Sequence, residues 1–471
     1  MGVNKVSKKG HTYLQWIFAL LGNVALFAYG LESGWMSPTI KIIQSEDSPT
    51  GYPLSDNMVA WIASSMSIAA TFGVSIYSFL ADKFGRKSGV ILIAILQAIS
   101  WIIKLSYTST TTLLMARFFS GLAAGGCFNI VPMYVKEIGQ DDIRGILGTF
   151  SVAMQTTGIL IMYLLGAYLD YFTVIKMVLA IPILTALLFT RAPESPAFLV
   201  RKGKIDKAAK TVAFLRGLDQ DDKIVQSIVE SMKSEDEYFK SLPQLTIVGI
   251  LKEKPWRRGF IIITVLFICH SLNGAFAIVT YASSVLASTG VKFDISPEVQ
   301  AISFPVVMII ASISLAAIVE RCGRKIILFG AFLLSACSMS IIAVLMVIQK
   351  QGGYVPSWLP GLAMVLAVAM YGGGVSPLPY IIMTEMFCFQ IRAKVVGVVV
   401  TVAWFLTSVL VTIYAPMVNS FGPHSPFMLY AIINLSGAIF TIIFLPETRG
   451  KGEEEILNLL GKKIIKTNNP L

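Results

Sequence analysis

Charged residues and histidines are scarce in this 471-residue sequence, and their scarcity excludes several classes of protein. Only 14% of the residues are Asp, Glu, Lys or Arg, and three are histidines. We find no Ser/His/Asp set, no metal cluster and no glycine-rich phosphate loop followed by Lys and Ser or Thr. The sequence also lacks the hydrophilic stripe or charge ring of an ion channel. We therefore predict that the protein is not an enzyme, an ATP-driven pump or a channel, and that it needs no cofactor and no metal.

Cysteine usage and the amino terminus add two further exclusions. The five cysteines follow neither a metal-ligand spacing nor a disulfide framework, so we interpret them as packing residues. The basic first eleven residues precede an apolar run that is too long for a signal peptide and lacks a small-residue cleavage site. Val6 stands where a myristoylation signal has Ser or Thr. We expect a retained first membrane helix and no lipid anchor.

Long apolar runs are what the sequence has in abundance. Hydrophobic residues make up 55% of it, and apolar runs recur along the whole chain. Because about 20 apolar residues cross the hydrocarbon core as a helix, the pattern predicts an all-α membrane protein. The twelve predicted spans are 14–36, 58–80, 88–106, 111–134, 146–168, 172–190, 259–287, 298–319, 325–348, 358–383, 394–417 and 425–445.

The spans form two groups of six, separated by one long polar segment. This segment runs from Arg191 to Arg258 and holds 14 Lys/Arg and 10 Asp/Glu. The predicted organisation is a cytoplasmic amino terminus (1–13), a first six-helix bundle (14–190), a cytoplasmic linker with short helices (191–258), a second six-helix bundle (259–445) and a cytoplasmic tail (446–471).

The positions of the cations predict the orientation of the chain. With twelve helices, the basic loops, the linker and both termini fall on one side, which the positive-inside rule identifies as cytoplasmic. The net charge of +11 is thus mostly an insertion signal. Since the basic residues are scattered over loops, we expect no nucleic-acid partner. We expect a multi-pass protein of the plasma membrane that contacts the lipid bilayer; the oligomeric state stays open, with a monomer among the options.

Three charged signatures occur twice, once in each half. The second copies follow the first by 238, 248 and 253 residues (320 minus 82, 385 minus 137, 447 minus 194). The pairs are Asp82–Lys87 with Glu320–Lys325, Glu137 and Arg144 with Glu385 and Arg392, and Pro193–Ser195 with Pro446–Thr448. Such a duplication is typical of a secondary transporter built from parallel repeats, whose substrate site lies between the halves near the membrane midplane.

An ordered set of motifs carries a resemblance to a known family. The motifs are Asp82-x-x-Gly85-Arg86-Lys87, Arg117-x-x-x-Gly121, Pro132-x-Tyr134-x-x-Glu137, Arg144-Gly145, Pro193-Glu194-Ser195-Pro196, Glu320-Arg321-x-Gly323-Arg324-Lys325, Pro377-x-Pro379, Glu385, Arg392 and Pro446-Glu447-Thr448. From about Gly30 to Lys451 the chain resembles the sugar-porter family of the major facilitator superfamily, and Gly34-Trp35-x-Ser37-Pro38 is similar to the insect trehalose and hexose carriers. The resemblance implies twelve transmembrane helices in two six-helix halves (the major facilitator fold) and transport by alternating access.

The resemblance further implies a latch of charged residues at the cytoplasmic face, closed in the outward-open state and broken when the halves rock. Its guanidinium and carboxylate groups would form bidentate, charge-assisted hydrogen bonds. The alternative is that these charges only obey the positive-inside rule. The predicted latch residues are Asp82, Arg86, Arg117 (placed at the cytoplasmic end of the fourth helix), Glu137, Arg144, Glu194, Glu320, Arg324, Glu385, Arg392 and Glu447.

The substrate-facing positions depart from the family's pattern. His270 and Ser271 stand at two family glutamines, Phe276 at a family asparagine and Tyr380 at a family tryptophan. Because an unsatisfied buried polar group costs roughly 1–3 kcal/mol, the cavity is lined by other groups, holds a less hydroxylated solute or is no longer used. Packing or interhelical hydrogen bonding is the alternative role for each candidate. The predicted substrate-binding residues are Gln155, His270, Ser271, Asn273, Phe276, Tyr281, Tyr380, Trp404 and Thr407.

Glu32 is an acid within the first apolar run, at a position where proton-coupled sugar porters carry an aspartate. An acid within a membrane span is a functional candidate by default. One hypothesis is that protonation of Glu32 biases the equilibrium between inward- and outward-facing states and couples transport to protons. The alternative is that Glu32 lies near the external end of its helix and is hydrated.

Glycine and proline clusters predict close helix contacts and one bend. Gly121, Gly125 and Gly126 would let helices approach closely. The segment Gly372–Gly374, with Pro377 and Pro379 after it, favours a kink in the tenth helix.

The sequence thus predicts a secondary transporter that moves a sugar (trehalose or a hexose) or a related polyol, either facilitative or linked to protons. Two alternatives stay open. One is a carrier of a non-sugar solute, and the other is a divergent membrane sensor that keeps the transporter fold without transporting. The identity of the small-molecule solute is not predicted.

Overall fold

The computed structural model describes residues 10–106, 108–241, 247–288, 295–356, 358–387, 389–451 and 453–461. Within these ranges the regular secondary structure is helical, which confirms the all-α prediction. Each of the twelve predicted spans overlaps one helix that is long and apolar enough to cross a membrane. These helices are Tyr13–Ile43, Asp56–Phe84, Arg86–Ser106, Thr110–Ile138, Asp142–Tyr168, Tyr171–Phe189, Lys254–Thr280, Pro297–Val319, Arg324–Lys350, Trp358–Met386, Lys394–Phe421 and Ser425–Phe444.

Seven helices build the first half. The first span comprises α1 (Tyr13–Gly34) and α2 (Met36–Ile43), which meet at Trp35. The other spans are α3 (Asp56–Phe84), α4 (Arg86–Ser106), α5 (Thr110–Ile138), α6 (Asp141–Tyr168) and α7 (Tyr171–Phe189). Side chains of Ser55, Ser109 and Asp170 accept backbone N–H groups at the starts of α3, α5 and α7. These caps satisfy donors that have no partner within the helix.

The polar linker forms short helices with a small apolar core of their own. They are α8 (Pro196–Arg201), α9 (Ile205–Arg216), α10 (Lys223–Ser241) and α11 (Ile247–Lys252). Leu199, Val212 and Val225 belong to this core. The end of α9 is bonded to the start of the first half, because His11 N donates to Arg216 O at 2.7 Å. The linker helix α9 is therefore attached to the first bundle.

The second half repeats the six spans with two of them interrupted. Its elements are α12 (Lys254–Ser271), α13 (Ala275–Thr280), α14 (Ala282–Ser288), α15 (Pro297–Ala301), α16 (Ser303–Cys322), α17 (Arg324–Lys350), α18 (Trp358–Met370), the π-helix η1 (Tyr371–Val375), α19 (Pro377–Met386), α20 (Phe389–Phe421) and α21 (Ser425–Phe444), followed by α22 (Glu453–Gly461). The seventh span breaks before Gly274, whose φ of +95° favours glycine. The tenth span is interrupted where a kink was predicted, by the π turn that holds Gly372–Gly374.

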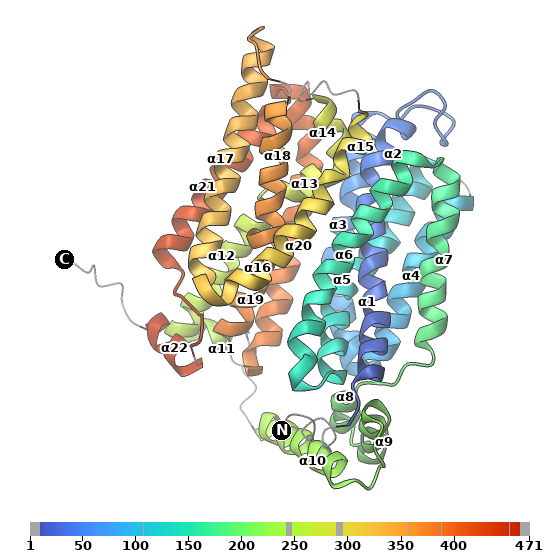
Figure 1. Ribbon diagram of the computed structural model, residues 1–471, viewed down its shortest axis with the longest axis vertical. Helices are drawn as coiled ribbons and strands as arrows, with labels where there is room; N and C mark the ends of the chain where they lie inside the picture. Colours follow the sequence, from blue (N-terminus) through green and yellow to red (C-terminus); the bar gives the residue numbers. More distant parts are fainter. Residues whose placement is uncertain are drawn as a thin grey trace, which may run out of the picture.

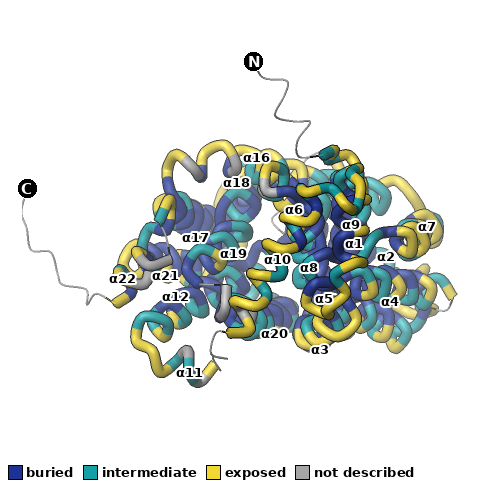
Figure 2. Tube along the Cα trace, turned by 90° about the horizontal axis from the view of Figure 1, so that it is seen from below, coloured by how far each residue is buried: buried dark blue, intermediate teal, exposed yellow. Residues whose placement is uncertain are grey.

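The two bundles stand side by side, and their two ends differ (Figure 1). We call the end where α1 begins and where α8, α9, α10 and α22 lie the terminal face. We call the end that carries α2, α14 and α15 the opposite face. Figure 2 views the molecule from the terminal face and shows buried residues inside the bundles and exposed residues around them. Large apolar side chains such as Phe79, Ile313 and Ile432 are exposed on the outside, as expected of helices that face lipid.

Glycines mark the places where helices cross most closely. A Cβ at Gly121 of α5 would lie 2.2 Å from Met66 O of α3, and one at Gly125 would lie 2.6 Å from Ala70 O. The predicted close approach at this cluster is therefore present. A second crossing joins α1 to α6, where a Cβ at Gly158 would lie 2.2 Å from Phe27 O. Only a residue without a side chain fits at these contacts.

Two glycines of α6 allow this packing to be tested. Gly158→Ala should lower the apparent melting temperature, because overpacking typically costs about 1–3 kcal/mol. Gly148→Ala is the matched control, since a Cβ there meets nothing within 4 Å. The control should keep or slightly raise the melting temperature, because Ala has the higher helix propensity. Thermal unfolding of both variants in detergent decides the matter, and equal losses would contradict the proposed crossing.

Candidate functional site

The first charge cluster at the terminal face is centred on Arg86. Its Nε and Nη2 donate to Glu137 Oε2 at 2.9 Å and Oε1 at 3.0 Å, and the Arg86 side chain is only 1% exposed. Glu194 Oε1 accepts the backbone N–H groups of Arg86 at 2.9 Å and Lys87 at 3.1 Å. Gly85, with φ of +98°, makes room for this carboxylate at the turn between α3 and α4. The cluster thus joins three segments that are distant in sequence.

The second half repeats this cluster almost bond for bond. Arg324 Nε and Nη2 donate to Glu385 Oε1 at 3.1 and 2.9 Å, and Glu447 accepts the backbone N–H groups of Arg324 and Lys325 at 3.0 and 3.1 Å. Gly323 takes the place of Gly85, with φ of +86°. The duplication seen in the sequence is therefore a duplication of hydrogen bonds.

The remaining predicted latch residues have different positions. Arg144 Nη2 donates to Gly139 O at 3.2 Å and Arg392 Nε to Phe387 O at 3.0 Å, in each case to a carbonyl five residues before the arginine, so these two arginines have equivalent partners. Asp82 is exposed. The side chain of Glu320 lies outside the part of the chain that the structure describes. The ion pairs of both clusters connect segments of the same half, and a latch from one half to the other stays a prediction.

The predicted position of Arg117 was wrong. Helix α5 starts at the opposite face, and Arg117 lies about two turns from its start at Thr110, far from the terminal face. Its Nη1 donates to Glu32 O at 2.7 Å, and its Nε donates to Ile62 O at 3.3 Å. The physical reason is simple: a fourth helix runs from the side opposite the amino terminus, so its early residues lie near that side. Arg117 belongs to a different cluster.

This buried cluster surrounds Glu32 at the end of α1. Lys104 Nζ lies 2.6 Å from Glu32 Oε2, and Ser100 Oγ donates to Oε1 at 2.8 Å. Arg117 Nη1 lies 3.8 Å from Glu32 Oε2. The three charged side chains are at most 2% exposed. Glu32 is therefore buried and paired, which contradicts the alternative of a hydrated acid; its role in proton coupling stays a prediction.

Lys104 is a member of this cluster that was not predicted from the sequence. The residue lies in the last turn of α4 and contacts the rings of Trp35 and Trp101, whose centroids are 4.4 and 3.7 Å from its Nζ. A single lysine near the end of an apolar run could have been noticed as the partner of the acid near the end of α1, since a buried charge needs a countercharge.

The two halves contact each other at the opposite face. Ser283 N donates to Ser37 Oγ at 3.1 Å and Ser283 Oγ to Ser37 O at 2.5 Å. Three further contacts cross between the halves there: Tyr163 OH donates to Val279 O, Lys41 Nζ lies 3.5 Å from Glu298 Oε1, and Asn419 Nδ2 donates to Asp56 Oδ2 at 3.2 Å. This face is therefore closed by bonds between the halves.

Aromatic rings occupy the place where the halves meet. Trp404 of α20 lies against Tyr29 and Phe128 of the first half, at centroid distances of 6.3 and 5.9 Å, and against Phe276 at 6.4 Å. Phe276 and Trp404, both predicted substrate-binding residues, are thus brought together. All four of these side chains are aromatic and none carries a carboxamide, in line with the altered positions noted in the sequence.

His270 and Tyr380 form a neighbouring group on the second half. His270 Nδ1 is 3.0 Å from Val375 O in the π turn, and its ring stacks on Tyr371 with an interplanar angle of 17°. Tyr380 meets His270 edge to face at 5.9 Å. The histidine therefore has an interhelical partner that fixes its orientation.

The other predicted substrate-binding residues differ in whether their side chains already form hydrogen bonds. Asn273 donates to Asn434, and Tyr281 OH donates to Val411 O at 3.3 Å, so both connect helices of the second half. Thr407 Oγ1 donates to Ala403 O in its own helix. Ser271 Oγ is buried with no hydrogen-bond partner, and Gln155 is half-buried on α6. Ser271 is the candidate with unused hydrogen-bonding capacity.

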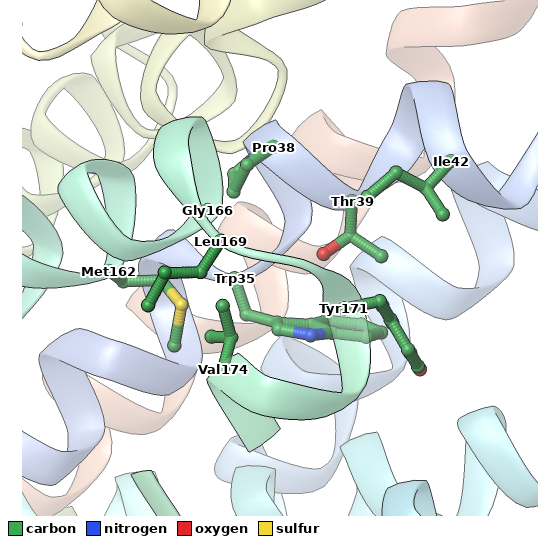
Figure 3. Close-up of a pocket in the computed structure, with 9 residues that line it drawn as sticks. All are labelled: Trp35, Pro38, Thr39, Ile42, Met162, Gly166, Leu169, Tyr171 and Val174. Carbon is green, nitrogen blue, oxygen red and sulfur yellow. The ribbon is translucent and has the colours of Figure 1, made fainter. Parts of the chain in front are cut away.

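A small pocket opens on the first half near the opposite face (Figure 3). Trp35 and Tyr171 lie side by side along it, with ring centroids 6.3 Å apart. The remaining lining residues are Pro38, Thr39, Ile42, Met162, Gly166, Leu169 and Val174. The pocket is mostly apolar and contains none of the predicted substrate-binding residues.

Comparison with known proteins places the chain in a family. A family model described as "Sugar (and other) transporter" matches residues 18–460. The chain belongs to this family. The transporter is 26% identical over 448 residues to the facilitated trehalose transporter Tret1 of Culex quinquefasciatus, covering 94% of the chain and 85% of the relative. It is 27% identical to Tret1 of Anopheles gambiae, covering 95% of the chain but only 56% of the relative.

Solved structures show the same fold. The xylose transporter XylE from E. coli in its inward open conformation aligns with a TM-score of 0.76 at 20% identity, covering 94% of this chain and 99% of XylE. The partially occluded inward open conformation gives 0.77 at 18% identity, with 93% and 99% covered. The transporter is thus a multi-pass membrane protein with the major facilitator fold, and it is not an enzyme.

Glu447 gives a pH-dependent prediction for the terminal face. Partial burial opposes ionisation, but backbone N–H groups of Arg449, Arg324, Lys325 and Thr448 donate to its carboxylate and together lower its pKa below the usual 4.5. A carboxyl with a lowered pKa stabilises the fold above its ordinary pKa and loses that contribution as the pH falls through the lowered value.

Glu447→Gln should therefore lower the apparent melting temperature at neutral pH, because its amide would point a donor at backbone donors. The difference from the wild type should shrink in acid. Glu455→Gln, which removes an exposed pair with Lys451, should have no measurable effect. Melting curves recorded as a function of pH test this, and a difference that stays constant into acid would show that the carboxylate charge is unimportant.

Proposed function

We propose that this transporter moves a sugar, trehalose or a hexose, or a related polyol, across the plasma membrane by alternating access. In this proposal the bundles 14–190 and 259–445 rock as two units about a site between them, and the linker 191–258 and both termini are cytoplasmic. The basic loops at the terminal face support that orientation through the positive-inside rule.

The distribution of bonds between and within the halves carries the proposal. At the opposite face, bonds such as those between Ser37 and Ser283 join one half to the other. At the terminal face, the Arg86 and Arg324 clusters bond segments within a half. Such an arrangement can open at either end without breaking a buried ion pair inside a bundle. With the proposed orientation, the present conformation is closed to the outside.

The side chains where the two halves meet bear on which solutes would fit the site. Aromatic rings such as Trp404 and Phe276 suit the apolar C–H faces of a sugar ring, and Ser271 and Gln155 offer polar contacts for its hydroxyls. The relatives named facilitated trehalose transporters, at 25–27% identity, make trehalose the first solute to test. We propose that these four residues, with Tyr380 and His270, line the solute path.

A second candidate function rests on the bonds already made by these residues. His270 is bonded to Val375 O and Asn273 to Asn434, so fewer polar groups are available than a sugar with many hydroxyls requires. This observation favours a less hydroxylated solute or a sensor that does not transport.

Uptake into proteoliposomes distinguishes these functions. Purified transporter should accelerate equilibration of radiolabelled trehalose, a hexose or a polyol and show counterflow when vesicles are preloaded with the same solute. Trp404→Ala should reduce this rate at least severalfold, whereas Phe405→Ala, which removes an exposed ring on the same helix, should not. Correctly folded protein that moves no member of the panel would reject sugar transport and favour the sensor.

A further inference from the structure

The Glu32 cluster contains more positive than negative charge, and all of it comes from the first half. Glu32 of α1 faces Lys104 of α4 and Arg117 of α5, and each of the three side chains is at most 2% exposed. One carboxylate thus lies near two cations. Such a set persists in a membrane protein only if every charge is compensated in place.

The two cations are compensated in different ways. Arg117 donates to backbone carbonyls of Glu32, Ile62 and Ala63, so dipoles of α1 and α3 absorb its charge. Lys104 has the Glu32 carboxylate at 2.6 Å and the faces of Trp35 and Trp101. The carboxylate is therefore the full countercharge of Lys104, and Lys104 is the nearest cation to it.

The other groups around the carboxylate, in the part of the chain that the structure describes, are uncharged. Tyr29 of α1, Tyr171 of α7 and Tyr281 of the second half are the further described titratable side chains within electrostatic range of Glu32 or Arg117. Ser100 adds a hydroxyl donor. Among these, only Tyr281 would move away if the second half moved. Glu32 and Lys104 both belong to the first half, so movement of the second half would not by itself separate them.

We infer that Lys104 is a permanent counter-cation that keeps Glu32 ionised throughout the cycle and makes this transporter facilitative rather than proton-coupled. The inference rests on the proposed transport function and deepens it. A carboxyl that couples proton movement must alternately gain and lose a proton, and adding one here would leave Lys104 buried without its countercharge. Lys104 neutralises the Glu32 charge permanently, whereas in a proton-coupled carrier an exchangeable proton would neutralise it for part of the cycle.

The decisive variant is Lys104→Met, which removes the charge and keeps an unbranched apolar chain. Lys104→Arg retains the charge and serves as the conservative control. The double variant Glu32→Gln/Lys104→Met removes both members of the pair and keeps the cluster balanced around Arg117. All are prepared as full-length protein in proteoliposomes, and the double variant keeps the test interpretable if the single variant unfolds.

The first readout does not depend on transport. Infrared difference spectra recorded between about pH 5 and pH 8 detect the carbonyl stretch of a protonated carboxylic acid. A band is assigned to Glu32 if the Glu32→Gln substitution removes it. Wild type and Lys104→Arg should show no band that is assigned to Glu32 in this way. Lys104→Met should show one, and the double variant should lack it. A Glu32 band in the wild type, or none in folded Lys104→Met, would overturn the inference.

The second readout is uptake with and without an imposed pH gradient. Wild-type uptake should follow the solute gradient alone. Uptake by Lys104→Met should change with pH by up to about tenfold per unit where Glu32 titrates, and the double variant should be flat again. Wild-type uptake driven by a proton gradient would overturn the role of Lys104 while leaving transport established. Absence of any uptake, with the infrared pattern as expected, would reject the transport function and leave the assignment of Lys104 standing.

Discussion

One arginine side chain holds each half of this transporter together, because its guanidinium donates both to a carboxylate from another helix and to a backbone carbonyl of the helix before it. Near the edge of the hydrocarbon a charge must be paired, because lipid offers no substitute for water. Arg86 and Glu137 meet this requirement in the first half, and Arg324 and Glu385 in the second. Because both pairs lie inside a half, each bundle is a unit whose internal bonds do not depend on where the other bundle stands.

The pairing of buried charges distinguishes the contacts within each half from the contacts between the halves. The Glu32–Lys104 pair and both terminal clusters are internal to a half. Contacts between the halves are of a weaker kind, such as hydroxyl–backbone bonds at Ser37 and Ser283 and an ion pair between the exposed Lys41 and the half-buried Glu298. Weak bonds between halves and strong bonds within them are what a rocking carrier requires, since the first kind must break in each cycle.

Much of this arrangement could be predicted from the sequence. Apolar runs of sufficient length predicted the twelve helices, and repeated Gly-Arg-Lys and Pro-Glu signatures predicted the duplication, because both depend on local rules of burial and charge. The interruption of the tenth helix by a π turn at Gly372–Gly374 also lies where the sequence predicted a break in regular α-helix. The altered substrate positions were also visible, since Phe276 and Trp404 do meet at the centre.

The contacts that could not be predicted are those that depend on which helices are neighbours in the folded protein. Arg117 was assigned to the wrong end of its helix because its motif, rather than its position along an alternating chain, was used to place it. Lys104 was overlooked because a single lysine in an apolar run acquires meaning only when α1 and α4 are known to be neighbours. The partners of His270 and Asn273, Val375 O and Asn434, lie 105 and 161 residues away. Such pairings come from tertiary packing, which periodicity does not encode.

If the halves rock, the bonds between them at the opposite face must break during transport, while those within a half need not. Cysteines at Ser37 and Ser283, in a background without the five native cysteines, place two thiols on residues that two hydrogen bonds now join, one from Ser283 N to Ser37 Oγ and one from Ser283 Oγ to Ser37 O. A pair at Ser78 and Asn129, whose side chains are bonded at 2.7 Å within the first half, is the control. Oxidation should abolish uptake in proportion to the Ser37–Ser283 cross-link, reduction should restore it, and the control cross-link should leave it unchanged. Full uptake by protein cross-linked between Ser37 and Ser283 would contradict the account.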